Sequence, residues 1–308
     1  MIVVVCPGQG SQTPGFLNPW LRDPAFAAGL DEISVACGID LLRHGTVSDA
    51  ETIRDTRIAQ PLIVAAGLLT LEALLTGGRR DRIAGIAGHS VGEITAAAGA
   101  GILSAADAVR FVRERGDAMA EAAALEPSGM SAVLGGDETE LLARLKELDL
   151  APANFNGGGQ IVAAGGLAAL TALAENPPPR TRVIPLQVAG AFHTRYMQPA
   201  VGHLSEVAAQ LLPGDPTLPI WTNDDGSMVD SGARFVQLMV DQVSSPVRWD
   251  LCMRSFADAG VTGIIEVAPA GALVGLAKRA LKGVPSVAIK TPDDLPAAFD
   301  LIDQQNQV

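Results

Sequence analysis

A short glycine-flanked segment in the first third of the chain limits its fold more than any other feature. An apolar run over residues 83–87 leads into Gly88-His89-Ser90-Val91-Gly92, and an alanine-rich stretch follows. This order predicts a buried strand, a sharp turn that carries Ser90, and a helix from about Val91. A Gly-x-Ser-x-Gly pentapeptide at such a turn is typical of a nucleophile elbow, which lifts the serine oxygen clear of the backbone. The N–H groups at the start of the helix would suit a developing oxyanion beside Ser90.

A second interpretation of this segment is purely structural. Ser90 and Glu93 have the spacing of a capping box, in which serine and glutamate together satisfy the first N–H groups of a helix. The pentapeptide alone also arises by chance in chains rich in glycine and serine. The strand before it and the helix after it favour the nucleophile.

Strands and helices alternate along most of the chain. Apolar stretches at 2–6, 264–267 and 286–289 predict buried strands, and Gln60-Pro61 predicts the start of a helix that ends at Gly77-Gly78. Such alternation is typical of a parallel sheet with both faces covered by helices. With 308 residues, of which 48% are hydrophobic, the chain can bury a large core. We predict an α/β fold with an α/β-hydrolase-like core.

The pattern changes between residues 128 and 193. The predicted order there is β-α-β-β-α-β, with a hairpin across Gly157-Gly158-Gly159. This order predicts a small ferredoxin-like subdomain. We therefore predict a large domain over 1–127 and 194–308, into which the subdomain 128–193 is inserted.

Charge, hydropathy and cysteine content disfavour several classes of protein. A net charge of −12 disfavours a general nucleic-acid binder, although it permits a local basic patch. No apolar run approaches the length of a membrane span, and the first residues lack the features of a signal peptide, so we expect a cytoplasmic protein. Cys6, Cys37 and Cys252 are scattered, which suggests buried thiols. The four histidines show no metal-ligand spacing, so we expect no metal site.

Two further side chains could act with Ser90. Arg115 falls on the apolar stripe of a predicted helix over 104–124, and a guanidinium there needs an anionic partner that the sequence does not reveal. His193 lies where the inserted subdomain returns to the core, which would bring it to the crevice between the domains as a base. A lone histidine at this place could equally be an ordinary polar loop residue. The order serine then histidine permits a hydrolase triad, but no aspartate stands out as its third member.

The loop Gly8-Gln9-Gly10 after the first strand also has two interpretations. It could be a simple glycine turn, or its backbone could complete an oxyanion hole with the N–H that follows Ser90. A dinucleotide fingerprint would need glycine where Thr13 stands, and a Walker A lysine is missing. A nucleotide-binding oxidoreductase is therefore disfavoured.

Several short motifs occur in order along essentially the whole chain. They are Pro7-Gly8-Gln9-Gly10-Ser11-Gln12, Gln60-Pro61, Gly88-His89-Ser90-Val91-Gly92-Glu93, Arg115-Gly116 followed by Met119, Asn154-Phe155-Asn156, Phe192-His193 and Ser245-Pro246-Val247-Arg248-Trp249. By this combination, which is far more specific than any one motif, the chain resembles the malonyl-CoA:acyl carrier protein transacylases. That family supplies malonyl groups to fatty acid and polyketide synthases.

The resemblance implies a catalytic dyad of Ser90 and His193 without a carboxylate. It also implies that the backbone carbonyl of Gln242 orients His193. The N–H groups of Gln9 and Val91 would form the oxyanion hole.

The resemblance further implies a substrate pocket in which Arg115 clamps the malonyl carboxylate. Gln60 and Asn156 would contribute to this pocket. Phe192, directly before the histidine, is similar to the residue of malonyl-selective members, whereas methylmalonyl-selective members usually carry serine there.

The expected reaction is a ping-pong transfer of a malonyl group from malonyl-CoA to the phosphopantetheine thiol of acyl carrier protein, through an ester on Ser90. No metal or redox cofactor is expected. Three alternatives stay open: an editing hydrolase on the same scaffold, a trans-acting acyltransferase of a polyketide synthase, and a non-catalytic subunit that docks carrier proteins. The sequence does not distinguish fatty acid from polyketide synthesis.

An acidic enzyme that binds an acidic carrier protein needs a local basic surface. Five basic residues flank the predicted active-site segments and are expected to include this surface. They are Arg195, Arg248, Lys278, Arg279 and Lys282.

Overall fold

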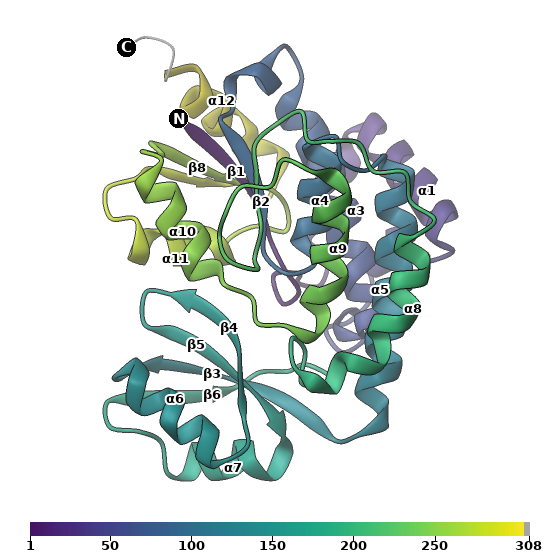
Figure 1. The fold of residues 1–308 in the computed structure, drawn as a ribbon. Coiled ribbons are helices and arrows are strands. Elements are labelled where there is room, and N and C mark those ends of the chain that lie inside the picture. The colour runs from purple at the N-terminus through teal and green to yellow at the C-terminus, as the bar shows by residue number, and fades with distance from the viewer. Residues whose placement is uncertain (305–308) are drawn as a thin grey trace.

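The computed structural model describes residues 1–304 and contains two sheets (Figure 1). A five-stranded sheet lies in the upper part of the view, and a four-stranded sheet lies below it. The upper sheet takes its strands from both sides of the segment Ser128–Pro185, and that segment alone forms the lower sheet. The predicted α/β class is confirmed, whereas the closer likeness to an α/β-hydrolase core stays a prediction.

The five-stranded sheet is parallel in every pairing, in the order β7-β2-β1-β8-β9. Its central strand is β1 (Ile2–Cys6), between β2 (Gly85–Gly88) and β8 (Gly263–Glu266). The edges are β7 (Ile220–Trp221) and β9 (Ser286–Ala288). All residues of β1 are buried, as expected for a strand with helices on both faces.

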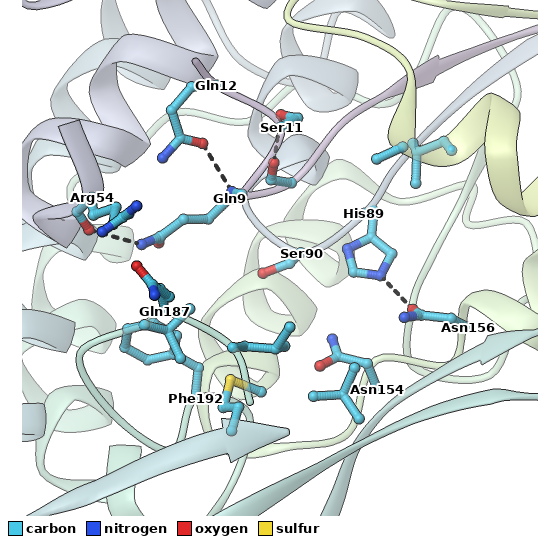
Figure 2. A pocket seen from close by; sticks show the side chains of 18 of the residues that line it. Gln9, Ser11, Gln12, Arg54, His89, Ser90, Asn154, Asn156, Gln187 and Phe192 are labelled. Carbon is cyan, nitrogen blue, oxygen red and sulfur yellow. Dashed lines mark hydrogen bonds between the residues drawn. The ribbon is translucent and has the colours of Figure 1, made fainter. Parts of the chain in front are cut away.

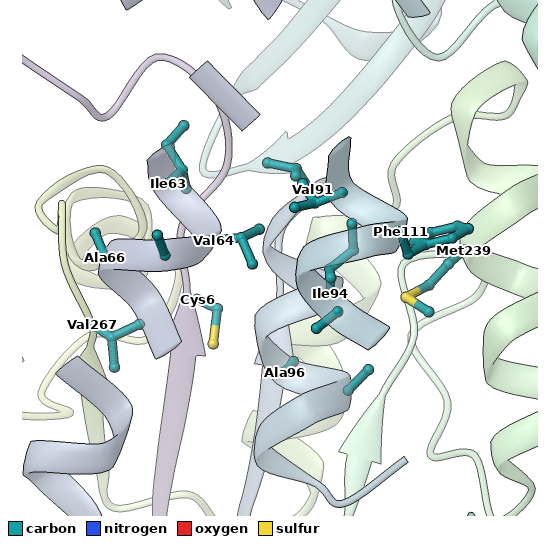
Figure 3. Close-up of a cluster of buried hydrophobic side chains, with 14 of the residues drawn as sticks. Cys6, Ile63, Val64, Ala66, Val91, Ile94, Ala96, Phe111, Met239 and Val267 are labelled. Atoms are coloured by element: carbon teal, nitrogen blue, oxygen red, sulfur yellow. The ribbon is translucent and has the colours of Figure 1, made fainter. Parts of the chain in front are cut away.

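Alternate residues of β1 point to opposite faces of the sheet and belong to different cores. Ile2 and Val4 pack into the larger core, and Val3 and Val5 into the smaller one. Figure 3 shows the centre of the larger core, where side chains of α3 and α4 lie around Cys6. Helices that contribute to the larger core include α3 (Thr56–Leu75), α4 (Gly92–Gly99), α5 (Ala105–Leu125), α8 (Gln198–Ala208) and α9 (Gly232–Asp241).

The smaller core contains a cluster of aromatic rings under α10 (Trp249–Asp258) and α11 (Ala272–Ala280). Trp221 and Trp249 both meet the ring of Phe256 edge to face, with centroids 5.0 and 6.0 Å apart. The sequence analysis did not predict helix α10. Its aromatic side chains belong to a tertiary core that the local pattern did not reveal.

The four-stranded sheet has the order β4-β5-β3-β6 and is antiparallel in every pairing. With two helices packed on it, it has the predicted β-α-β-β-α-β order of a ferredoxin-like unit. Its elements are β3 (Ser128–Gly135), α6 (Glu138–Glu147), β4 (Ala151–Gly157), β5 (Gln160–Gly166), α7 (Leu167–Glu175) and β6 (Thr181–Pro185). Helices α1 (Pro24–Cys37), α2 (Leu41–Thr46) and α12 (Leu295–Gln304) also contribute buried side chains to the larger core.

Helix α3 differs from the sequence prediction in two ways. It begins at Thr56, where the Asp55 side chain accepts a hydrogen bond from the Arg57 N–H, so Pro61 lies inside the helix and does not start it. It is also long and apolar enough to cross a membrane, so the expectation that no apolar run reaches that length is wrong. However, 78% of its most apolar window is buried inside the protein, as in the core helix of a globular fold.

Candidate active site

The turn between β2 and α4 has the geometry of a nucleophile elbow. Ser90 has a φ of +53°, a backbone conformation that L-residues rarely adopt. A Cβ on Gly88 would lie 2.0 Å from the carbonyl carbon of Gly92, and a Cβ on Gly92 would lie 2.1 Å from the carbonyl oxygen of Cys6. Both positions therefore require glycine. The capping-box alternative is wrong, because Val91 precedes α4 and the Glu93 carboxylate is hydrogen-bonded elsewhere.

His193 and Gln242 continue a hydrogen-bonded line from Ser90. Ser90 Oγ lies 2.7 Å from His193 Nε2, and His193 Nδ1 lies 2.8 Å from the carbonyl oxygen of Gln242. A carbonyl can only accept, so Nδ1 carries the proton and Nε2 turns a lone pair toward the serine. Burial, then the nearby charge of Arg115, lowers the pKa of His193 to about 3. The imidazole is therefore neutral and available as a base, in the place the sequence predicted.

Arg115 lies beside Ser90 and is 1% exposed. Its Nη1 donates to Gln60 Oε1 at 2.7 Å and its Nη2 to Gln242 Oε1 at 3.0 Å, while Nη2 also lies 3.5 Å from Ser90 Oγ. The sequence revealed no internal partner for this arginine, yet the structure provides two, both uncharged oxygens. Burial lowers the pKa of Arg115 to about 10, so the group keeps its charge at neutral pH. A small anion beside Ser90 would therefore meet a fixed guanidinium.

A buried polar cluster behind the elbow was missed by the sequence analysis. Asn223 Oδ1 accepts a hydrogen bond from the Ser90 N–H at 2.8 Å, and its Nδ2 donates to the carbonyl of Gly88 at 2.7 Å. The Glu93 carboxylate accepts from the Asn223 N–H and from Gln242 Nε2, each at 2.6 Å. The only sequence signal was an acidic residue just after the elbow, which had a simpler interpretation as a cap.

A cavity of about 770 Å³ opens above Ser90, between the two sheets (Figure 2). Apolar side chains form part of its lining, among them Met119, Met130 and Phe192. Gln60 also lines it, with Nε2 3.4 Å from the sulfur of Met119. The cavity thus joins apolar walls to the dyad, a combination suited to a ligand with an aliphatic and a polar part.

Gln9 stands across the cavity from Phe192, and its side chain points toward Arg54 (Figure 2). Within residues 1–304, the backbone N–H groups of Gln9 and Val91 have no hydrogen-bond acceptor. Both belong to turns beside Ser90 and are free to bind a developing oxyanion.

Asn156 also lines the cavity, but its amide oxygen is held by His89 Nε2 at 2.9 Å (Figure 2). His89 packs edge to face on Trp249, and burial lowers its pKa. This pair therefore forms a rigid wall of the cavity.

The five predicted docking residues differ in their surroundings. Arg195 pairs with Asp149, and Arg248 pairs with Asp250 at 2.8 Å, so their charge is partly neutralised. Arg279 lies at the cavity and donates to Gln160 at 3.0 Å. Lys278 and Lys282, in and directly after α11, are exposed. In the part of the chain that the structure describes, no group of three or more histidine, cysteine or acidic side chains could hold a metal ion.

Comparisons with known proteins identify the family of this chain. The model of the acyl transferase domain family matches residues 3–292. A curated malonyl CoA-acyl carrier protein transacylase of Mycobacterium tuberculosis is 52% identical over 98% of this chain and 100% of its own length. The corresponding Escherichia coli K12 protein is 32% identical over 96% of this chain and 98% of its own.

Solved structures give the same result. The crystal structure of the M. tuberculosis enzyme covers 97% of this chain and 99% of its own, with a TM-score of 0.93 and 51% identity. A malonyl-transacylase in complex with a type II polyketide synthase acyl carrier protein has a TM-score of 0.91 and 29% identity, over 97% of this chain and 99% of its own. The chain therefore belongs to the acyl transferase family and, within it, to the malonyl CoA-acyl carrier protein transacylases.

Proposed function

We propose that Ser90 and His193 carry out malonyl transfer by a ping-pong mechanism, with Arg115 as the clamp for the malonyl carboxylate. The observation that carries the proposal is the arrangement around Ser90 Oγ, which lies 2.7 Å from the imidazole and 3.5 Å from the guanidinium. A base and a fixed cation thus meet at one nucleophile.

In the first half-reaction, Ser90 Oγ attacks the thioester carbon of malonyl-CoA while His193 Nε2 takes the hydroxyl proton. The N–H groups of Gln9 and Val91 stabilise the oxyanion. The carbon–sulfur bond then breaks, and the CoA sulfur leaves with the proton from His193. A malonyl ester on Ser90 remains.

In the second half-reaction, the phosphopantetheine thiol of the acyl carrier protein gives its proton to His193, and its sulfur attacks the ester. The bond to Ser90 Oγ breaks, and the serine regains the proton. Acyl carrier protein is proposed as the partner because a related malonyl-transacylase was solved in complex with one. No step calls for a metal or redox cofactor, and we expect the reaction to occur in the cytoplasm.

The neutral partner of His193 would favour transfer over hydrolysis. A histidine held by the carbonyl of Gln242 is a weaker base than one beside aspartate. A thiol is far more acidic than water, so the weaker base suffices for the thiol and activates water poorly. An editing hydrolase would need the opposite balance. Release of free malonate as fast as transfer to carrier protein would favour that alternative.

Intact-protein mass spectrometry after incubation with malonyl-CoA tests the nucleophile. Wild type should gain one malonyl group and lose it when holo acyl carrier protein is added. Ser90→Ala should fold normally and gain none, because no other side chain stands at the elbow. A malonyl adduct that persists on Ser90→Ala would refute the proposed mechanism.

A further inference from the structure

A buried chain of hydrogen bonds joins Glu93 to Arg115 through the side chain of Gln242. Gln242 Nε2 donates to Glu93 Oε2 at 2.6 Å, and Gln242 Oε1 accepts from Arg115 Nη2 at 3.0 Å. Glu93 and Arg115 are each 1% exposed and Gln242 is 6% exposed. Water therefore does not compete for these hydrogen bonds, and an unmet donor or acceptor here would be costly.

The donors and acceptors of these three groups permit one orientation of the Gln242 amide. An ionised carboxylate only accepts and a guanidinium only donates, whereas the amide has one end of each kind. With Glu93 as carboxylate, the amide NH₂ must face Glu93, and the oxygen is left for Arg115. The reverse orientation would set NH₂ against the guanidinium and oxygen against the carboxylate. Burial raises the pKa of Glu93 to about 8, even though the Asn223 N–H and the charge of Arg115 lower it. The assignment as carboxylate rests on geometry, because each of its two oxygens accepts an N–H hydrogen bond at 2.6 Å.

The orientation of the Gln242 amide determines whether the Arg115 guanidinium has a hydrogen-bond acceptor at Nη2. Gln60 holds Nη1 at 2.7 Å and Gln242 holds Nη2, so two amide oxygens fix the plane of the group beside Ser90. A bidentate pair with a carboxylate requires such a fixed plane. Because the partners of Arg115 are uncharged, the cation also stays available to an anionic substrate. Its counter-charge, Glu93, lies one amide away.

We propose that Glu93 is a positioning residue that acts through Gln242 to hold Arg115 in the orientation that binds the malonyl carboxylate. By this route Glu93 sets the preference for malonyl over neutral acyl groups. The inference rests on the role proposed above for Arg115.

Glu93→Gln tests this relay, the hydrogen-bonded path from Glu93 through the Gln242 amide to Arg115, with little change in side-chain shape. The new amide can still accept from Asn223, but it then offers NH₂ to Gln242, whose amide must turn over and present NH₂ to Arg115. We expect the ratio of kcat/KM for malonyl-CoA to kcat/KM for acetyl-CoA to fall by about ten- to a hundredfold, the range for one lost charge-assisted hydrogen bond. The acetyl value should be nearly unchanged.

Gln242→Met provides a second measurement. This variant keeps the backbone carbonyl that holds His193 and removes only the amide. It should lower the same ratio by a similar factor, and Glu93→Gln should add little to it in the double variant, because both act through one contact. If Glu93→Gln does not fold, Gln242→Met decides the test alone.

Glu266→Gln is the matched control. Glu266 is also a fully buried carboxylate with a raised pKa, but it accepts hydrogen bonds from the N–H groups of Gly271, Leu273 and Val274 at the start of α11. Its loss should lower thermal stability and leave the malonyl-to-acetyl ratio unchanged.

Three results would overturn the inference. They are an unchanged ratio in a folded Glu93→Gln or Gln242→Met, a raised ratio, which would mean that Glu93 only repels the substrate, and additive effects in the double variant. Arg115→Ala is measured in parallel. If it leaves the ratio unchanged, the clamp itself is wrong; if only the relay variants leave it unchanged, the clamp stands and the relay is wrong.

Discussion

Replacing Arg115 by alanine should change which acyl group the enzyme prefers. In the clamp, a malonyl carboxylate would form charge-assisted hydrogen bonds with a guanidinium that is 1% exposed. Removing one partner of such a buried pair costs about 2–5 kcal/mol. That corresponds to roughly a thirtyfold to several-thousandfold loss of kcat/KM for malonyl-CoA. Acetyl-CoA has no carboxylate and should lose little.

Arg115→Ala should also lower the stability of the protein, and this effect must be distinguished from the effect on substrate preference. Arg115→Ala leaves the amide oxygens of Gln60 and Gln242 without their donor, and each unmet buried acceptor costs about 1–3 kcal/mol. Circular dichroism and a thermal melt should therefore show a less stable but folded protein. Because both thioesters are compared on the same sample, a fall in active fraction cancels from their ratio.

The assay is kcat/KM for malonyl-CoA and acetyl-CoA on wild type, Arg115→Ala and Arg115→Lys. Lysine keeps the charge without the planar fork, so it should restore malonyl transfer only in part. If both thioesters fall by the same factor in folded Arg115→Ala, the arginine is structural and does not recognise the substrate.

Two further predictions concern the surface and the base. Reversing the exposed charges with Lys278→Glu and Lys282→Glu should slow transfer to acyl carrier protein in a salt-dependent manner and leave labelling by malonyl-CoA intact; equal loss in both half-reactions would rule out docking there. For His193, the pKa falls from an ordinary value of 6.5 to about 3 in the folded protein, so its contribution to stability is complete above pH 6.5 and is lost as pH falls toward 3. Between pH 7 and pH 5, wild type should lose roughly 2 kcal/mol more unfolding free energy than His193→Gln in chemical denaturation, and parallel losses would contradict a buried neutral imidazole.

The sequence predicted those parts of the site that depend on local pattern. Ser90 stands out because a strand, two glycines and a helix follow one another directly in the sequence. The structure shows why glycine is needed at both positions, since a Cβ on Gly88 or Gly92 would collide with neighbouring backbone. His193 and Arg115 have weaker local signals, which suggested a base and an anion-binding group but left other interpretations open. Their specific roles came from resemblance to a family. The start of α3 was misplaced because proline is favoured in the first turn of a helix, whereas Asp55 supplies the cap five residues before Gln60.

Contacts between segments that are distant in the chain could not be predicted from the sequence. The hydrogen bond from Asn223 to Glu93 joins residues 130 apart, and that from Gln242 to Glu93 joins residues 149 apart. No spacing rule connects such residues, and a buried glutamate behind a serine resembles an ordinary cap until the fold is known. Polar clusters of this kind are specified by tertiary packing and appear only when it is described.

The order of the segments along the chain has a consequence for the protein as it leaves the ribosome. Ser90 and His193 are 103 residues apart, and the whole second sheet lies between them. The carbonyl that orients the histidine belongs to Gln242, which is made later still. The central strand β1 can pair with β8, its neighbour on the second side, only when residues 263–266 have been made. A nascent chain therefore carries its serine without a base while the next 103 residues are added. It cannot be charged with an acyl group until almost all of the enzyme exists.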